Sequence, residues 1–81
     1  MDNANFFNNG QFLLIELLLE KNYYLRELAE RSSLAPSSVY KIMSELVSKM
    51  IVLAEKKKNL KFFSLNYNSS ITTSILRLIF V

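Results

Sequence analysis

Apolar residues recur at helical spacing along most of the 81-residue chain. A helix is predicted from Pro36 to about Met50, where they follow the i, i+3, i+4, i+7 pattern of one buried stripe at Val39, Ile42, Met43, Leu46 and Val47. A shorter helix is predicted from about Arg26 to Ser32. Another spans about Gly10 to Lys21, and its apolar side chains occupy nearly every direction around the axis, which indicates burial on more than one side.

After Met50 the period changes from helical to alternating, which predicts a β-hairpin. Residues 51–55 fit the first strand, residues 56–59 (Lys-Lys-Lys-Asn) a tight basic turn, and residues 60–66 the return strand. On the return strand Lys61, Phe63 and Leu65 share one face, because side chains alternate along a strand. A last helix is predicted from about Ser70 to Val81, and a stub of strand at residues 23–25.

Polar and special residues mark the expected ends of these elements. Asn8 or Asn9 can cap the first helix, and Asn22 is a plausible left-handed stop after it. Pro36 suits the first position of its helix, although Ala35 before it offers no capping side chain. We therefore expect a flexible arm over residues 1–9, a folded domain over residues 10–66 and a C-terminal helix within residues 67–81.

The composition excludes several kinds of chemistry. The chain has no cysteine and no histidine, so metal sites built on those residues and Ser-His-Asp or Cys-His nucleophiles are excluded. Glu16 with Glu20, and Glu27 with Glu30, have a spacing that could serve acid–base catalysis, but a solvated helix face explains it better. We expect no enzyme activity, no cofactor, no metal and no evident small-molecule ligand.

The sequence also bears on where the protein is located in the cell. The longest apolar run, Phe12 to Leu19 broken by Glu16, is shorter than the roughly 20 residues of a membrane span. The N-terminal residues carry no basic segment of a signal peptide. A cytoplasmic protein without a membrane partner is the expectation.

Charge is distributed unevenly. Up to Ala35 there are three basic and five acidic residues, whereas residues 36–66 hold six lysines and two glutamates, so a balance of −2 gives way to +4 within a net charge of +3. Such a division suggests a face that meets a polyanion. A solvated basic surface is the alternative interpretation.

Four short segments, taken in order, resemble a known class of regulators. Residues 25–34 (LRELAERSSL) resemble the hydrophobic-x-ELA-x-x-x-x-L second helix of winged helix-turn-helix proteins, and residues 36–42 (PSSVYKI) resemble the opening of their recognition helix. Leu46 with Ile51 and Val52 is similar to the run into their wing, and residues 61–65 (KFFSL) to its return strand. Between about Phe12 and Asn66 the chain thus resembles the winged helix-turn-helix DNA-binding superfamily, most closely MarR- and ArsR-type transcriptional regulators.

Two positions depart from this pattern. Ala35 stands where the family often has a capping serine or threonine, so the third helix is expected to begin with a weaker cap. Met50 stands where a glycine commonly ends that helix. The turn into the wing is therefore expected to be made differently.

The resemblance implies a mainly α fold with a small β-hairpin: a three-helix core, a two-stranded wing and a C-terminal helix. It also implies sequence-dependent binding of double-stranded DNA, with the helix at about 36–50 in the major groove and the wing at 51–66 on the flanking backbone. The expected contacts are small or cationic side chains on these two elements: Ser37, Ser38, Tyr40, Lys41, Ser44, Lys56, Lys57, Lys58, Asn59 and Lys61. Taken singly, the serines could serve only as caps and the lysines only as solubilising groups.

First and last helices commonly build a twofold dimer in the resembled families, which implies a homodimer here. The apolar residues expected at that interface are Phe12, Ile15, Leu19, Ile75, Leu78 and Ile79. The alternative is a winged helix that serves as a protein–protein interaction or assembly module, including one that is a fragment of a larger protein.

Overall fold

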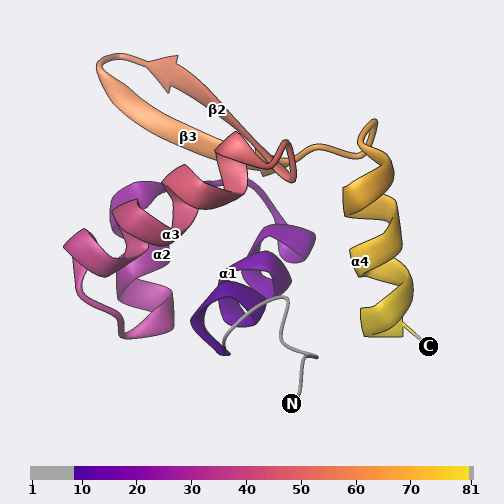
Figure 1. Ribbon diagram of the computed structural model, residues 1–81. Coiled ribbons are helices and arrows are strands. Elements are labelled where there is room, and N and C mark those ends of the chain that lie inside the picture. The colour runs from indigo at the N-terminus through magenta and orange to yellow at the C-terminus, as the bar shows by residue number, and fades with distance from the viewer. Residues whose placement is uncertain (1–8, 81) are drawn as a thin grey trace.

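The computed structural model describes the backbone of residues 9–80 and the side-chain burial of residues 10–78. Within that part the order is α1 (Asn9–Glu20), β1 (Tyr23–Tyr24), α2 (Leu25–Ser32), α3 (Pro36–Ser48), β2 (Val52–Lys57), β3 (Leu60–Leu65) and α4 (Ser70–Phe80) (Figure 1). This order confirms the predicted sequence of elements. Residues 1–8 of the arm expected over residues 1–9, the cap at Asn8 and the helix end at Val81 lie outside the described residues. Asn9, the other expected cap, is the first residue of α1.

The first three helices enclose one core, into which the predicted stripe of α3 points. Val39, Met43 and Leu46 are fully buried, while Ile42 and Val47 at the margins of the stripe are half-buried. Leu14, Ile15 and Leu18 of α1 meet them, as do Leu28 and Ala29 of α2. Burying such a set stabilises the fold by roughly 1.5–3 kcal/mol for each large aliphatic side chain. One face of α3 is therefore committed to the core, and the opposite face is left outside.

The sheet has three antiparallel strands in the order β1-β3-β2. Strand β3 is central: Tyr23 and Tyr24 pair with Phe63 and Phe62 on one side, and β2 pairs on the other with Val52 opposite Leu65. The expected two-stranded wing is thus anchored at its base by a third strand. This pairing fixes the direction of the hairpin, which reaches over α2 and α3 in Figure 1.

The hairpin turn is shorter than predicted. Strand β2 continues through Lys57, and the turn contains only Lys58 and Asn59, whose φ angles are 50° and 67°. Two central residues with positive φ give a turn whose twist matches that of the strands, and asparagine tolerates this conformation well. The predicted turn over residues 56–59 was wrong because cross-strand pairing extends β2 over two lysines that have little β propensity of their own.

The end of α3 is a Schellman motif, in which a left-handed residue reverses the chain. The backbone N–H of Ile51 donates to the carbonyl of Leu46 and that of Met50 to the carbonyl of Val47, both at 3.0 Å. Met50 has φ 66°. The expectation of a different turn was wrong: Met50 adopts the conformation that glycine usually supplies, and α3 ends at Ser48.

Of the two remaining predictions about helix ends, one was wrong and one is confirmed. Among the described residues positive φ occurs at Ser33, Met50, Lys58 and Asn59, so Asn22 is not the left-handed stop of α1. Ala35 precedes α3 without a side-chain cap, as predicted.

A buried polar cluster attaches α4 to the base of the wing. The Ile51 carbonyl accepts hydrogen bonds from the Asn66 backbone at 2.9 Å and from the Thr72 hydroxyl at 3.2 Å. The Asn66 side chain also donates to the Met50 carbonyl at 3.0 Å and accepts from the Asn68 backbone at 3.2 Å. Thr72 is 1% exposed, so its hydroxyl has this bond in place of water. The start of α4 is consequently fixed to the end of α3.

Candidate nucleic-acid interface

The outer face of α3 is polar and open to solvent. Ser37, Ser38, Lys41 and Ser44 are exposed, and Tyr40 is 50% exposed. Their orientation follows from the buried stripe on the other side of the same helix. Five predicted contact residues therefore lie together on one exposed surface, which we call the α3 face.

The wing divides its lysines between its two faces. In the β2–β3 register Lys56 is opposite Lys61, and both lie on the face that carries the buried Phe63 and Leu65, here called the inner face. Lys57 lies on the outer face, with its amino group 4.4 Å from the centre of the Phe62 ring. Lys58 and Asn59 form the exposed turn. The five predicted wing residues thus share one element but do not share one side of it.

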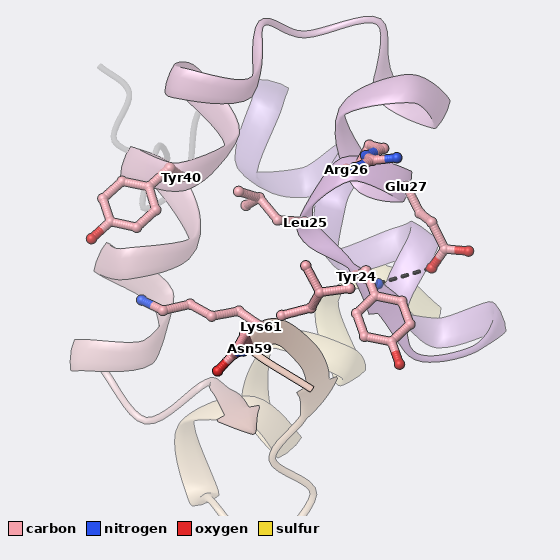
Figure 2. Close-up of a pocket in the computed structure, with 8 residues that line it drawn as sticks. Tyr24, Leu25, Arg26, Glu27, Tyr40, Asn59 and Lys61 are labelled. Atoms are coloured by element: carbon pink, nitrogen blue, oxygen red, sulfur yellow. Dashed lines mark hydrogen bonds between the residues drawn. The ribbon is translucent and has the colours of Figure 1, made fainter. Parts of the chain in front are cut away.

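A direct contact joins the wing to the α3 face. The amino group of Lys61 lies 5.0 Å from the centre of the Tyr40 ring, within the range of a cation–π interaction. Figure 2 shows the Lys61 side chain extending toward α3, on the side where Tyr40 stands. The inner face of the wing and the outer face of α3 therefore adjoin.

A cleft of about 460 Å³ opens beside this contact, lined by Tyr24, Leu25, Arg26, Glu27, Tyr40, Asn59, Leu60 and Lys61. It lies between the start of α2, the middle of α3 and the wing (Figure 2). The Glu27 carboxylate accepts a hydrogen bond from the Tyr24 backbone N–H at 2.9 Å, which caps the first turn of α2.

The apolar residues of the cleft, Leu25 on α2 and Leu60 on β3, were missed from the sequence. Leu25 and Leu60 have the pattern of core residues, yet Leu60 is 52% exposed. Their proximity depends on the pairing of β1 with β3, which local spacing does not reveal. The one signal available in the sequence was the alternation of side chains along the return strand. It placed Lys61 on the same face as Phe63 and Leu65.

The residues predicted at a dimer interface differ widely in their solvent exposure. Ile15 and Ile75 are 0% and 5% exposed and belong to the core of the single chain, so they offer no surface to a second copy. Phe12 and Leu19 are half-buried against that core. Leu78 is 66% exposed, and the side chain of Ile79 lies outside the described residues. Ile15 and Ile75 are therefore unsuited to an interface, because the small core of the single chain already buries both side chains.

The acidic side chains of α1 show no catalytic arrangement in the described part of the chain. Glu16 and Glu20 are exposed, and the hydrogen bond that the Tyr23 hydroxyl donates to the Glu20 carboxylate is 3.5 Å long. Between residues 9 and 80, histidine, cysteine and acidic residues form no group of three that could hold a metal ion. Within the same range no helix has both the length and the apolar character needed to span a bilayer.

Comparison with known proteins gives a match in structure alone. No family model and no curated protein matches the chain. The solved structures that match include the adhesin competence repressor AdcR of Streptococcus pyogenes, with TM-score 0.77 and 18% identity over 94% of this chain and 56% of that one. They also include the transcriptional regulator HlyU of Vibrio vulnificus, with TM-score 0.76 and 17% identity over 89% of this chain and 73% of that one.

A third match is the homodimeric winged helix-turn-helix DNA-binding domain Mb0332 of Mycobacterium bovis, a possible ArsR-family transcriptional regulator. It has TM-score 0.76 and 12% identity over 89% of this chain and 65% of that one. The chain therefore spans somewhat over half of AdcR and just under two thirds of the Mycobacterium domain. Identities this low show a shared fold.

Proposed function

Because the chain has the winged helix-turn-helix fold, we propose that it binds double-stranded DNA and regulates transcription in the cytoplasm. In this proposal α3 enters the major groove, and the wing lies on the adjoining backbone. Structural neighbours described as transcriptional regulators or as a DNA-binding domain support this proposal. The observation that carries it is the contact of Lys61 with Tyr40. This contact places the lysine-bearing hairpin next to the exposed polar face of α3.

The chemistry of the α3 face suits a major groove. That groove is about 12 Å wide and admits one helix, provided that the entering side chains are small or can bond with base edges and phosphates. Ser37, Ser38 and Ser44 are small hydroxyl donors and acceptors. Lys41 can reach a guanine or a phosphate, and Tyr40 presents a hydroxyl on a rigid ring. Lysine and serine predominate, so affinity would come mainly from phosphates and sequence preference would be modest.

We propose further that the DNA-bound form is a homodimer in which α1 and α4 of two copies meet. The exposed Leu78 and the half-exposed Ile71 on α4, with the half-buried Phe12 and Leu19 on α1, are the residues that we assign to this contact. A twofold dimer would place two recognition helices about 34–36 Å apart, the spacing of one turn of DNA. The homodimeric Mycobacterium domain supports this assembly.

A protein-interaction module is the second candidate. The observation that favours it is the apolar surface of α4, where Ile71 and Leu78 are 49% and 66% exposed. In that case the working surface would be α4 and α1, and the α3 face would meet no nucleic acid.

Binding to a labelled random duplex across a salt series separates the two candidates, with the mass in solution recorded in parallel. We expect binding that weakens steeply with salt, since the logarithm of affinity falls by about 0.9 per phosphate neutralised for each tenfold rise in salt. Absence of duplex binding at low salt would contradict the DNA proposal and favour the interaction module.

A further inference from the structure

We propose that the cleft between α2, Tyr40 and the wing seats the sugar–phosphate backbone of one DNA strand. In this arrangement Lys56 and Lys61 on the inner face of the wing hold a backbone phosphate, and Lys57 on the outer face holds none. The inference rests on the proposed DNA binding and goes beyond it, because it assigns different roles to adjacent lysines and gives the cleft an occupant.

Two lysines of like charge lie next to each other on the inner face of the wing. Lys56 and Lys61 are direct partners in the β2–β3 register, and like charges at such positions destabilise a hairpin. No acidic side chain among residues 10–78 forms an ion pair with either amino group. Glu55, the acidic residue nearest in sequence, is opposite Phe62 and lies on the outer face. The inner face therefore carries two adjacent positive charges that an external anion would neutralise.

The cleft presents both apolar and charged groups to a ligand. Its lining combines apolar groups, the side chains of Leu25 and Leu60 and the ring of Tyr40, with the cation of Lys61 on the wing and the opposite charges of Arg26 and Glu27 on α2. A nucleic-acid backbone alternates in the same way, since each deoxyribose offers C–H groups and each phosphate a negative charge. The cleft of about 460 Å³ has the size of a small-molecule site, enough for part of one strand.

The placement of phosphate and sugar within the cleft follows from the charges at its two sides. Figure 2 shows Lys61 extending toward α3, whereas Glu27 lies across from it beside Tyr24. On that side the Arg26 cation lines the cleft next to the Glu27 carboxylate, which the N–H of Tyr24 fixes in place. The α2 side therefore offers a phosphate no net positive charge. The phosphate is consequently placed at the Lys61 side and the sugar against the apolar residues.

The amino groups of Lys61 and Lys57 each lie over an aromatic ring before any ligand binds. Lys61 lies over the Tyr40 ring at 5.0 Å and is thereby held beside the cleft, which lowers the entropy lost on binding. Lys57 lies over Phe62 at 4.4 Å, and Phe62 in turn contacts Tyr24 with ring centres 4.7 Å apart. Lys57 thus braces the outer face of the wing.

The absence of cysteine from the chain allows a direct test by thiol footprinting. Lys56→Cys and Lys57→Cys each introduce a unique thiol, one on each face of the wing, and alkylation rates are measured with and without a saturating random duplex. We expect the duplex to slow alkylation of the Lys56→Cys variant several-fold and to leave the Lys57→Cys variant unchanged. Glu55→Cys provides a second outer-face control that leaves the Lys57–Phe62 contact intact.

Salt dependence of duplex binding supplies an independent readout. The double variant K56A/K61A is expected to lower the salt slope by about 0.9 for the one phosphate released, whereas K57A leaves it unchanged. Equal protection of both thiols, or protection of the Lys57→Cys thiol alone, would overturn the inference while DNA binding stands. Failure of the unmodified chain to bind any duplex would overturn the proposed function, and this inference with it.

Discussion

The amino group of Lys61 lies 5.0 Å from the centre of the Tyr40 ring, so the wing and α3 touch through two residues of the proposed DNA-binding surface. Tyr40 belongs to the outer face of α3, and Lys61 to the strand that is central in the sheet. Movement of the wing relative to α3 would break this contact. The two elements are therefore expected to meet DNA as one surface.

Replacing Tyr40 tests that coupling. Tyr40→Ala removes a cation–π contact worth about 0.5–1 kcal/mol at an exposed site, so we expect duplex affinity to fall two- to fivefold and wing amides to exchange faster. Tyr40→Phe keeps the ring and is expected to keep wing exchange at the wild-type rate. Hydrogen exchange and fluorescence anisotropy measure the two effects. Wing exchange that is the same in all three proteins would contradict the coupling.

Met50 is predicted to be a site where glycine stabilises the fold. Its φ of 66° places a Cβ in the left-handed region, and its side chain is 60% exposed, so little packing is lost on truncation. Met50→Gly should raise the free energy of unfolding by about 0.5–1 kcal/mol, the penalty of a left-handed Cβ less the added freedom of the unfolded chain. Urea denaturation measures the difference. Met50→Ala retains the Cβ and should give no gain; a gain equal to that of glycine would refute the explanation.

Thr72 is predicted to hold α4 in place through its hydroxyl. Thr72→Val removes the donor to the Ile51 carbonyl with little change of volume, and we expect a loss of about 1 kcal/mol in the free energy of unfolding. Thr73→Val is the matched control, because Thr73 bonds to the Ser69 carbonyl on the exposed side of the same helix. Its effect should stay within about 0.5 kcal/mol. Equal losses in both variants would mean that helix propensity, not the buried bond, is responsible.

Leu78 tests the proposed dimer contact. The side chain is 66% exposed in the single chain, so Leu78→Glu is expected to leave the fold intact while placing a charge in the interface. Sedimentation equilibrium should show a shift toward the monomer. Arg77→Gln, at the neighbouring exposed position, is the control and should keep the assembly of the unmodified chain. A Leu78→Glu variant with unchanged mass and unchanged circular dichroism would remove α4 from the interface.

Much of the local structure could be predicted because it depends on short-range periodicity. The stripe of Val39, Met43 and Leu46 fixed both the burial and the exposed face of α3, and strand alternation placed Lys61 with Phe63. Most of the candidate surface follows from these two patterns. Its remaining residues, Leu25 and Leu60 among them, depend on β1 pairing with β3, a long-range contact without a local signature.

Other errors came from residues that adopt conformations outside their usual preferences. Met50 takes the left-handed conformation because two hydrogen bonds of the Schellman motif and the burial of Ile51 stabilise it there. Lys56 and Lys57 are held in β2 by pairing with Lys61 and Leu60. Ile15 and Ile75 look like surplus apolar residues in the sequence, but the small core accommodates both. For Met50, Lys56 and Lys57 the surrounding contacts outweigh the intrinsic conformational preference, whereas for Ile15 and Ile75 the error lay in underestimating the capacity of the core.

The most direct test of DNA binding through α3 and the wing is a ¹⁵N–¹H correlation spectrum of the 81-residue chain titrated with a short random duplex. We predict that the amide signals that shift most belong to residues 37–44 and 56–61. Shifts confined to α1 and α4, or no shifts at low salt, would contradict the assignment of α3 and the wing as a DNA-binding surface.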